Sequence, residues 1–108
     1  MTTLRQWFDK FTDATGEEPT HIVFGLDYWN SEGRWPELVS DELVAWDDVA
    51  ASALDREFDA GYGGNNAPDF CAWSPSWVIF CDNYDGAESI CCVPRSPVAH
   101  EPIRPGGG

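Results

Sequence analysis

The sequence has few basic residues. Six lysines and arginines stand against 19 acidic residues, which gives a formal net charge of -13 at pH 7. Nucleic acids and anionic membranes bind proteins through clusters of basic side chains, so this balance argues against direct binding to either. It favours a partner with a basic surface, although a net negative charge also simply keeps a small protein soluble and monomeric.

Long apolar runs are also missing. No stretch approaches the roughly 20 apolar residues that a membrane span needs, and residues 1–10 lack the basic region and apolar core of a secretory signal. We therefore expect a cytoplasmic protein that does not bind membranes. In reducing cytoplasm the four cysteines are expected to be thiols: Cys71, Cys81, Cys91 and Cys92.

Recognisable metal motifs are absent. Asp55, Glu57 and Asp59 have the spacing of the first three ligands of a calcium-binding EF-hand loop. The sixth position, however, is Ala60 instead of glycine, and the twelfth is Asn66 instead of glutamate. The cysteines contain no pair at the two-to-four-residue gap that is typical of zinc sites. We predict no metal and no cofactor.

Motifs for nucleophilic catalysis are absent too. The two histidines, His21 and His100, belong to no recognisable arrangement with a nucleophile and an acid. Carboxylate pairs such as Asp82 and Asp85 cannot be judged without geometry. We therefore expect a protein that is not an enzyme, with a small enzyme or a cysteine-bound metal protein as an alternative.

The chain is 108 residues long and 43% hydrophobic, which fits one folded domain and leaves no room for a second. We assign residues 1–97 to a single globular domain. The Pro- and Gly-rich residues 98–108 are predicted to form a flexible C-terminal tail, because they cannot build a packed element.

Apolar periodicity predicts two helices. From Thr3 to Ala14 the apolar residues follow the spacing of one helical face, with Thr3 and Gln6 at capping-box positions and Gly16 at the C-cap. A second helix is expected from Asp47, as N-cap, through Phe58 to a stop at Gly61.

Alternation predicts strands at 21–29 and, more briefly, at 70–73. A hairpin follows, formed by residues 77–81 and 90–93 around the turn Asn83-Tyr84-Asp85-Gly86, in which Asp85-Gly86 supplies the positive φ that a tight turn requires. A two-residue turn there would place Cys81 opposite Ile90 and diagonal to Cys92. Both hairpin strands are almost continuously apolar, so we expect helices, a second subunit or a partner to cover both faces.

Together these elements predict a small α+β domain in the order helix, strand, helix, hairpin. We expect a three- or four-stranded, mainly antiparallel sheet packed by two helices. Residues 38–46 fit neither a helical nor a strand pattern clearly, and we leave them unassigned.

Four sequence segments between residues 54 and 97, LDREFDAGYGG, FCAW, YDGAES and VPRSP, resemble a set of small acidic proteins of actinobacteria and their phages. The functions of those proteins are uncharacterised, so the resemblance implies no catalytic or binding residue. It implies a setting, because small phage proteins often act by binding and disabling one host protein.

The acidic residues are concentrated between Glu37 and Asp59, where eight acids and one arginine give a local net charge of -7. Such a surface can attract a basic patch over a long range. Tryptophans in loops are typical interface anchors, and we place Trp35 and Trp73 in loops beside this block. The residues expected to bind a partner are Trp35, Asp47, Asp48, Asp55, Glu57, Asp59 and Trp73.

The leading hypothesis is therefore a non-enzymatic, phage-encoded protein-binding module, either a monomer or a homodimer. It would modulate or inhibit a host protein with a basic surface. The alternative to such a module, beside a small enzyme or metal protein, is a self-associating structural protein that uses the apolar hairpin.

Overall fold

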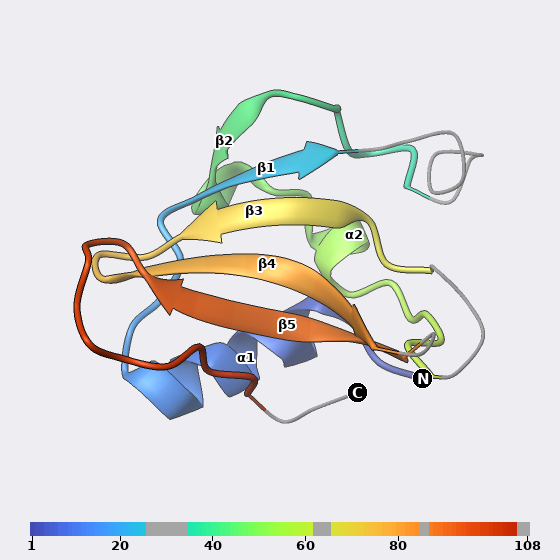
Figure 1. The fold of residues 1–108 in the computed structure, drawn as a ribbon. Helices are drawn as coiled ribbons and strands as arrows, with labels where there is room; N and C mark the ends of the chain where they lie inside the picture. Colours follow the sequence, from blue (N-terminus) through green and yellow to red (C-terminus); the bar gives the residue numbers. More distant parts are fainter. Residues whose placement is uncertain (26–34, 62–65, 85–86, 106–108) are drawn as a thin grey trace.

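An antiparallel sheet with the strand order β2-β1-β3-β4-β5 organises the fold (Figure 1). The computed structural model describes residues 1–25, 35–61, 66–84 and 87–105. Within them the protein is a small α+β domain with five strands, where the sequence predicted three or four. The strands are β1 (His21–Gly25), β2 (Leu43–Ala45), β3 (Asp69–Trp73), β4 (Trp77–Tyr84) and β5 (Ala87–Pro94). The additional strand is β2, from the stretch that the sequence left unassigned.

The first helix, α1 (Leu4–Thr15), forms as its sequence pattern predicted. Thr3 accepts a hydrogen bond from the backbone of Gln6, and the Gln6 side chain accepts one from the backbone of Thr3. Gly16 ends the helix in the left-handed conformation at φ 75°, which glycine adopts without strain. The apolar face is buried against the sheet by Leu4, Trp7, Phe8 and Phe11.

The second helix, predicted from Asp47 through Phe58, is present but much shorter than predicted. The chain forms a 3-10 turn, η1 (Trp46–Asp48), and then a single helical turn, α2 (Ala51–Leu54). Val49, with ψ 130°, and Ala50, with ψ 129°, adopt extended conformations that separate the two. Asp47 therefore lies inside η1 and is not the N-cap of a long helix.

Phe58 explains why the helix stops early. It leaves the helix to exchange two backbone hydrogen bonds with Thr2, at 2.9 and 2.8 Å. Its ring meets that of Trp7 edge-on, with the centroids 5.1 Å apart. Tertiary packing thus overrides the helical spacing of the sequence, since burying an aromatic ring outweighs one further helical turn.

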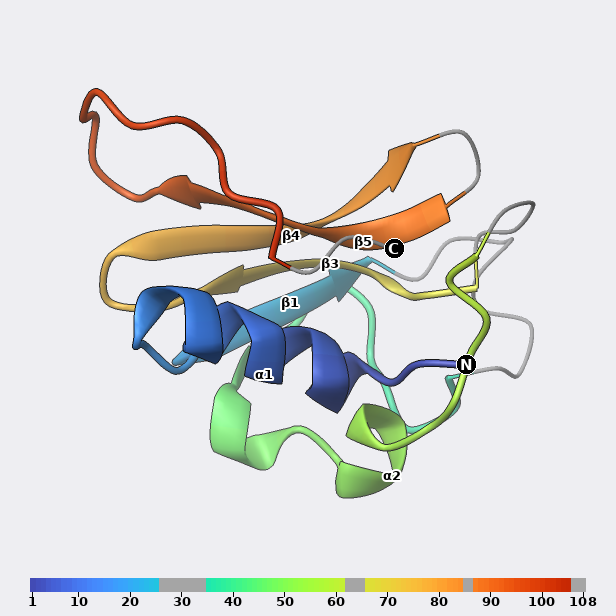
Figure 2. The ribbon, with the colours of Figure 1, turned by 90° about the horizontal axis from the view of Figure 1, so that it is seen from below.

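Both helices lie on one side of the sheet (Figure 2). The strand residues on that side are buried and form the core with α1: Ile22, Phe24, Phe70, Ala72, Ile79, Ile90 and Cys92. At one end of β5 the buried carboxylate of Glu88 accepts backbone N–H bonds from Asn66, at 2.6 Å, and from Ala67. Glu88 also donates its backbone N–H to Ala60, so a segment from the helical layer covers this end of the strand.

The strand register agrees with the sequence pattern over the described residues, but β3, β4 and β5 are longer than predicted. β3 begins at Asp69, β4 extends to Tyr84 and β5 begins at Ala87, so Asn83 and Tyr84, predicted in the turn, lie in β4. The predicted strand at 21–29 is present from His21 to Gly25, while residues 26–29 lie outside the described residues. In the hairpin Cys81 pairs with Ile90 and Ile79 with Cys92, as a two-residue turn predicted, and this register places Cys81 diagonal to Cys92. The turn residues Asp85 and Gly86 themselves lie outside the described part of the chain.

The C-terminal segment, expected to be a flexible tail, contacts the sheet along the edge of β5. Ile103 and Cys92 exchange backbone hydrogen bonds of 2.8 and 2.7 Å. Arg104 donates to Asp82 at 2.9 Å. The ring of His100 meets Trp77 edge-on, with the centroids 5.3 Å apart.

Candidate functional site

An ion pair between Arg56 and Glu37 lies at the centre of the acidic region. The guanidinium donates to both carboxylate oxygens, at 2.8 Å for the bond to Oε2, and the Ser52 hydroxyl donates to the same oxygen at 3.1 Å. Hydrogen bonding to Arg56 lowers the pKa of Glu37 to about 2. The guanidinium carbon also lies 5.3 Å from the ring centroid of Trp35, in a cation–π contact.

Two surface hollows meet at this ion pair, because Arg56 lines one and Glu37 lines the other. The first, which we call the tryptophan hollow, has a volume of about 360 Å³. Its lining is Met1, Trp35, Arg56, Glu57, Phe58, Asp59 and Asn66. This volume lies within the range of pockets that hold small molecules or side chains.

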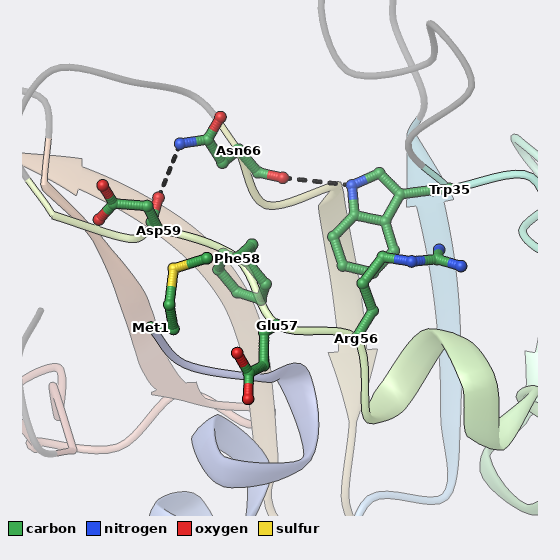
Figure 3. A pocket seen from close by; sticks show the side chains of 7 residues that line it. All are labelled: Met1, Trp35, Arg56, Glu57, Phe58, Asp59 and Asn66. Carbon is green, nitrogen blue, oxygen red and sulfur yellow. Dashed lines mark hydrogen bonds between the residues drawn. The ribbon is translucent and has the colours of Figure 1, made fainter.

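Side chains from distant parts of the chain build the tryptophan hollow (Figure 3). The indole nitrogen of Trp35 donates to the backbone carbonyl of Asn66 at 3.2 Å, and the Asn66 side chain donates to the carbonyl of Asp59 at 2.8 Å. Phe58 lies between Met1 and Trp35, while the carboxylates of Glu57 and Asp59 point away from the indole. The hollow is thus apolar inside and acidic at its rim.

The second, which we call the acidic hollow, has a volume of about 330 Å³ and lies between β2 and the segments before and after it. Three carboxylates line it, those of Glu37, Glu42 and Asp48. Its wall also includes two of the most exposed large apolar side chains, Val39 at 58% and Leu43 at 63% exposure. An aliphatic chain that ends in a cation matches such a surface, because the stem covers apolar groups and the charge meets carboxylates.

The structure brings together only some of the residues predicted to bind a partner. Trp35, Glu57 and Asp59 meet at the tryptophan hollow, but Trp35 is buried, with 3% exposure, so it is a core residue and not an exposed loop anchor. Asp48 lines the acidic hollow, and Asp47 is exposed next to it in η1.

Two other predicted residues have different surroundings. Asp55 accepts two hydrogen bonds from Arg5, which lower the pKa of its carboxyl group. Trp73 lies at the end of β3 and not in a loop, half-buried on the face of the sheet opposite the helices. Sequence reasoning missed Glu37, Glu42 and Arg56 as individual site residues, although all three belong to the acidic block that it singled out.

The cysteines and carboxylates form no metal site among the described residues: nowhere do three potential ligands gather. The same residues contain four free thiols. Burial raises the pKa of Cys81 and of Cys92 to about 12, so both are unreactive at neutral pH. Asp82, proposed as one member of a carboxylate pair, bonds Arg104, and Asp85 lies outside the described residues.

None of the described helices is both long and apolar enough to cross a membrane. Comparison of the chain with protein-family models, with curated proteins and with solved structures found no match.

Proposed function

We propose that this protein is a non-enzymatic protein-binding module whose acidic side docks on the basic surface of a partner. One observation carries the proposal: exposed carboxylates surround two hollows, one apolar inside and one lined by both carboxylates and apolar side chains, that meet at the Arg56–Glu37 ion pair. The exposed carboxylates in or beside the hollows are those of Glu42, Asp47, Asp48, Glu57 and Asp59. Charge attracts the partner, and the hollows give its apolar side chains a place to bind.

The charged rim and the apolar surfaces of the hollows have different roles in binding. Charges around the rim increase the association rate and select partners of opposite sign, but exposed ion pairs contribute little affinity each. Desolvated apolar contacts supply most of the binding free energy. A partner that fits both features presents lysine or arginine side chains beside at least one apolar side chain.

The setting implied by the sequence resemblance makes the partner a host protein, which the module would modulate or inhibit. The proposal requires neither a cofactor nor a reaction. It places Glu42, Asp47 and Asp48 at the contact and leaves Asp55, which already binds Arg5, outside it.

Affinity capture from an actinobacterial lysate tests the proposal. The tagged protein is compared with Asp47→Asn/Asp48→Asn and with the control Glu18→Gln/Glu101→Gln, which removes two exposed charges elsewhere. We expect one host protein with a basic surface to be retained by the wild type and the control, and lost from the first variant. Equal retention by all three proteins, or no retained protein, would contradict the proposal.

A further inference from the structure

The face of the sheet opposite the helices carries two apolar rows that run across neighbouring strands. The strand register aligns Leu43, Val23, Cys71 and Phe80 in the first row. The second row contains His21, Trp73, Val78 and Val93. We call this surface the open face. The first row continues from Phe80 to Cys91 of β5. The apolar side chains of the open face are half-buried, except Leu43, which is 63% exposed, and Cys91, which is buried.

No described helix covers the open face, since α1 and α2 both pack on the other side (Figure 2). The rows reach from β2 to β5, about 19 Å at the usual spacing of strands. Soluble monomers rarely expose a continuous apolar surface of such extent, and one that does usually contacts another protein. The hairpin strands are almost continuously apolar, so the sequence predicted that other groups cover both of their faces. The helices cover one of these faces.

Charge is distributed unevenly between the two sides of the molecule. Asp47 and Asp48 lie in η1, in the layer beneath the sheet and away from the open face (Figure 2). Among the strand residues of the open face the acidic ones are Asp69 and Asp82, and Arg104 pairs with Asp82. The open face can therefore approach another acidic molecule without bringing the main acidic regions together.

The two ends of the open face differ in charge. At one end His21 and Arg95 line a shallow pocket of about 250 Å³ beside Trp73, with Thr20 and Leu43. Arg95 is held there by a hydrogen bond from its guanidinium to the carbonyl of Ser74 at 2.9 Å. The other end carries Asp69, four residues before Trp73 on the same strand face and so roughly 13 Å away.

We propose that the open face binds a second copy of this chain, which forms a two-fold symmetric dimer. In a two-fold interface the same surface meets itself in reverse, so a residue at one end contacts the opposite end of the partner. Asp69 of each copy then faces the Arg95 and His21 end of the other. Val23, Cys71 and Phe80 pack in the middle, as in two sheets stacked face to face about 10 Å apart.

Asp47 and Asp48, in the layer beneath the sheet, stay accessible on both copies of this dimer, while Leu43 lies where the open face meets the acidic hollow. The dimer does not rest on the proposed function. The two interfaces respond to salt in opposite directions. Binding of a basic partner weakens as salt screens attraction. Dimerisation strengthens, because salt screens the repulsion between two chains of charge -13.

Light scattering of the purified chain tests the proposal. At micromolar concentration and moderate salt we expect about twice the chain mass of 12.0 kDa, and a smaller average mass at low salt. Phe80→Asp should raise the dimer dissociation constant more than about tenfold, because it places a charge in the middle of the interface. Ala51→Asp, which introduces the same charge at an exposed residue of α2 on the other side of the sheet, should leave the constant unchanged.

Charge reversal tests the orientation and also guards against a misfolded variant. Asp69→Arg and Arg95→Asp should each weaken the dimer, and the double variant should regain most of the lost affinity, since it restores opposite charges at both contacts. A wild-type chain that stays monomeric at moderate salt, or a dimer that Phe80→Asp leaves intact while circular dichroism shows it folded, would overturn the proposal.

Discussion

Arg56 and Glu37, which are 19 residues apart in the sequence, form a hydrogen-bonded ion pair that is the common wall of two surface hollows. The pair fixes the short helical segment α2 to the segment that precedes β2. Ser52 reinforces it from α2, and the indole of Trp35 lies under the guanidinium. Because one interaction borders both hollows, its loss should change stability and the shape of the proposed contact together.

Removing the charge of Glu37 should destabilise the protein in a pH-dependent way. Glu37→Gln should lower the free energy of unfolding by about 1–3 kcal/mol at neutral pH, the usual range for hydrogen bonds to charged groups. The ion pair lowers the pKa of Glu37 from 4.5 to about 2 in the folded state. Its stabilisation is therefore complete above pH 4.5 and disappears as the pH falls toward 2.

Urea unfolding of the wild type and Glu37→Gln across this range measures the effect. The difference between the two proteins should shrink steadily below pH 4.5. Glu18→Gln, which removes an exposed carboxylate, is the control and should show no comparable difference. A difference for Glu37→Gln that stays constant from neutral to acid pH would mean that its carboxylate contributes nothing through its charge.

Trp35 should contribute far more to stability than Trp73. Trp35 is 3% exposed, and its ring contacts Phe58 with the centroids 5.7 Å apart. Trp35→Ala should therefore cost about 3–5 kcal/mol of unfolding free energy, the typical loss for a large core side chain. Trp73→Ala should cost less, because Trp73 is half-buried on the open face. Equal losses in chemical denaturation would place Trp35 outside the core.

The four cysteines should remain reduced and react slowly in the folded protein. Diagonal residues on neighbouring strands lie about 7–8 Å apart at Cα, beyond the usual limit for a disulfide, so Cys81 and Cys92 should not bond. Alkylation at pH 8 should be much slower at these two thiols than in the denatured chain, because their pKa is about 12. Mass spectrometry after treatment with an oxidised thiol would refute this if the pair lost two hydrogen atoms, the mass change of a new disulfide.

Local signals in the sequence were enough to predict α1 and the hairpin. In α1 all the signals lie within one helix: the capping residues Thr3 and Gln6, the apolar spacing that follows them, and the C-cap Gly16. In the same way, the Asp85-Gly86 pair predicted the hairpin, and the register that a two-residue turn there would give is the one that pairs Cys81 with Ile90. Helix caps and tight turns depend on residues that are close together in the chain, so they can be recognised from a single sequence.

Long-range contacts decided what the sequence could not predict. β2 is three residues long and forms by pairing with β1, so Leu43–Ala45 carries too short a pattern to stand out. The helix after Asp47 ends early because Phe58 pairs with Thr2, which lies far away in the sequence, before α1. The periodicity of a segment does not indicate which distant segment it pairs with.

The candidate site was predicted in part for the same reason. The acidic block contains the carboxylates that line both hollows, since charge density is visible in sequence. Which carboxylates are held in ion pairs depends on where Arg5 and Arg56 lie in the fold, and these arginines bind Asp55 and Glu37. Asp47 and Asp48 belong to neither of these ion pairs, so substituting them tests the proposed contact most clearly.

Calorimetric titration of the captured partner at two salt concentrations, about 0.05 and about 0.2 M, tests the acidic docking side most directly. We expect the affinity of the wild type to fall severalfold at the higher salt. Asp47→Asn/Asp48→Asn should bind more weakly and show a smaller salt dependence, while Glu18→Gln/Glu101→Gln should match the wild type. An affinity that neither salt nor the Asp47 and Asp48 substitutions change would show that the partner binds elsewhere.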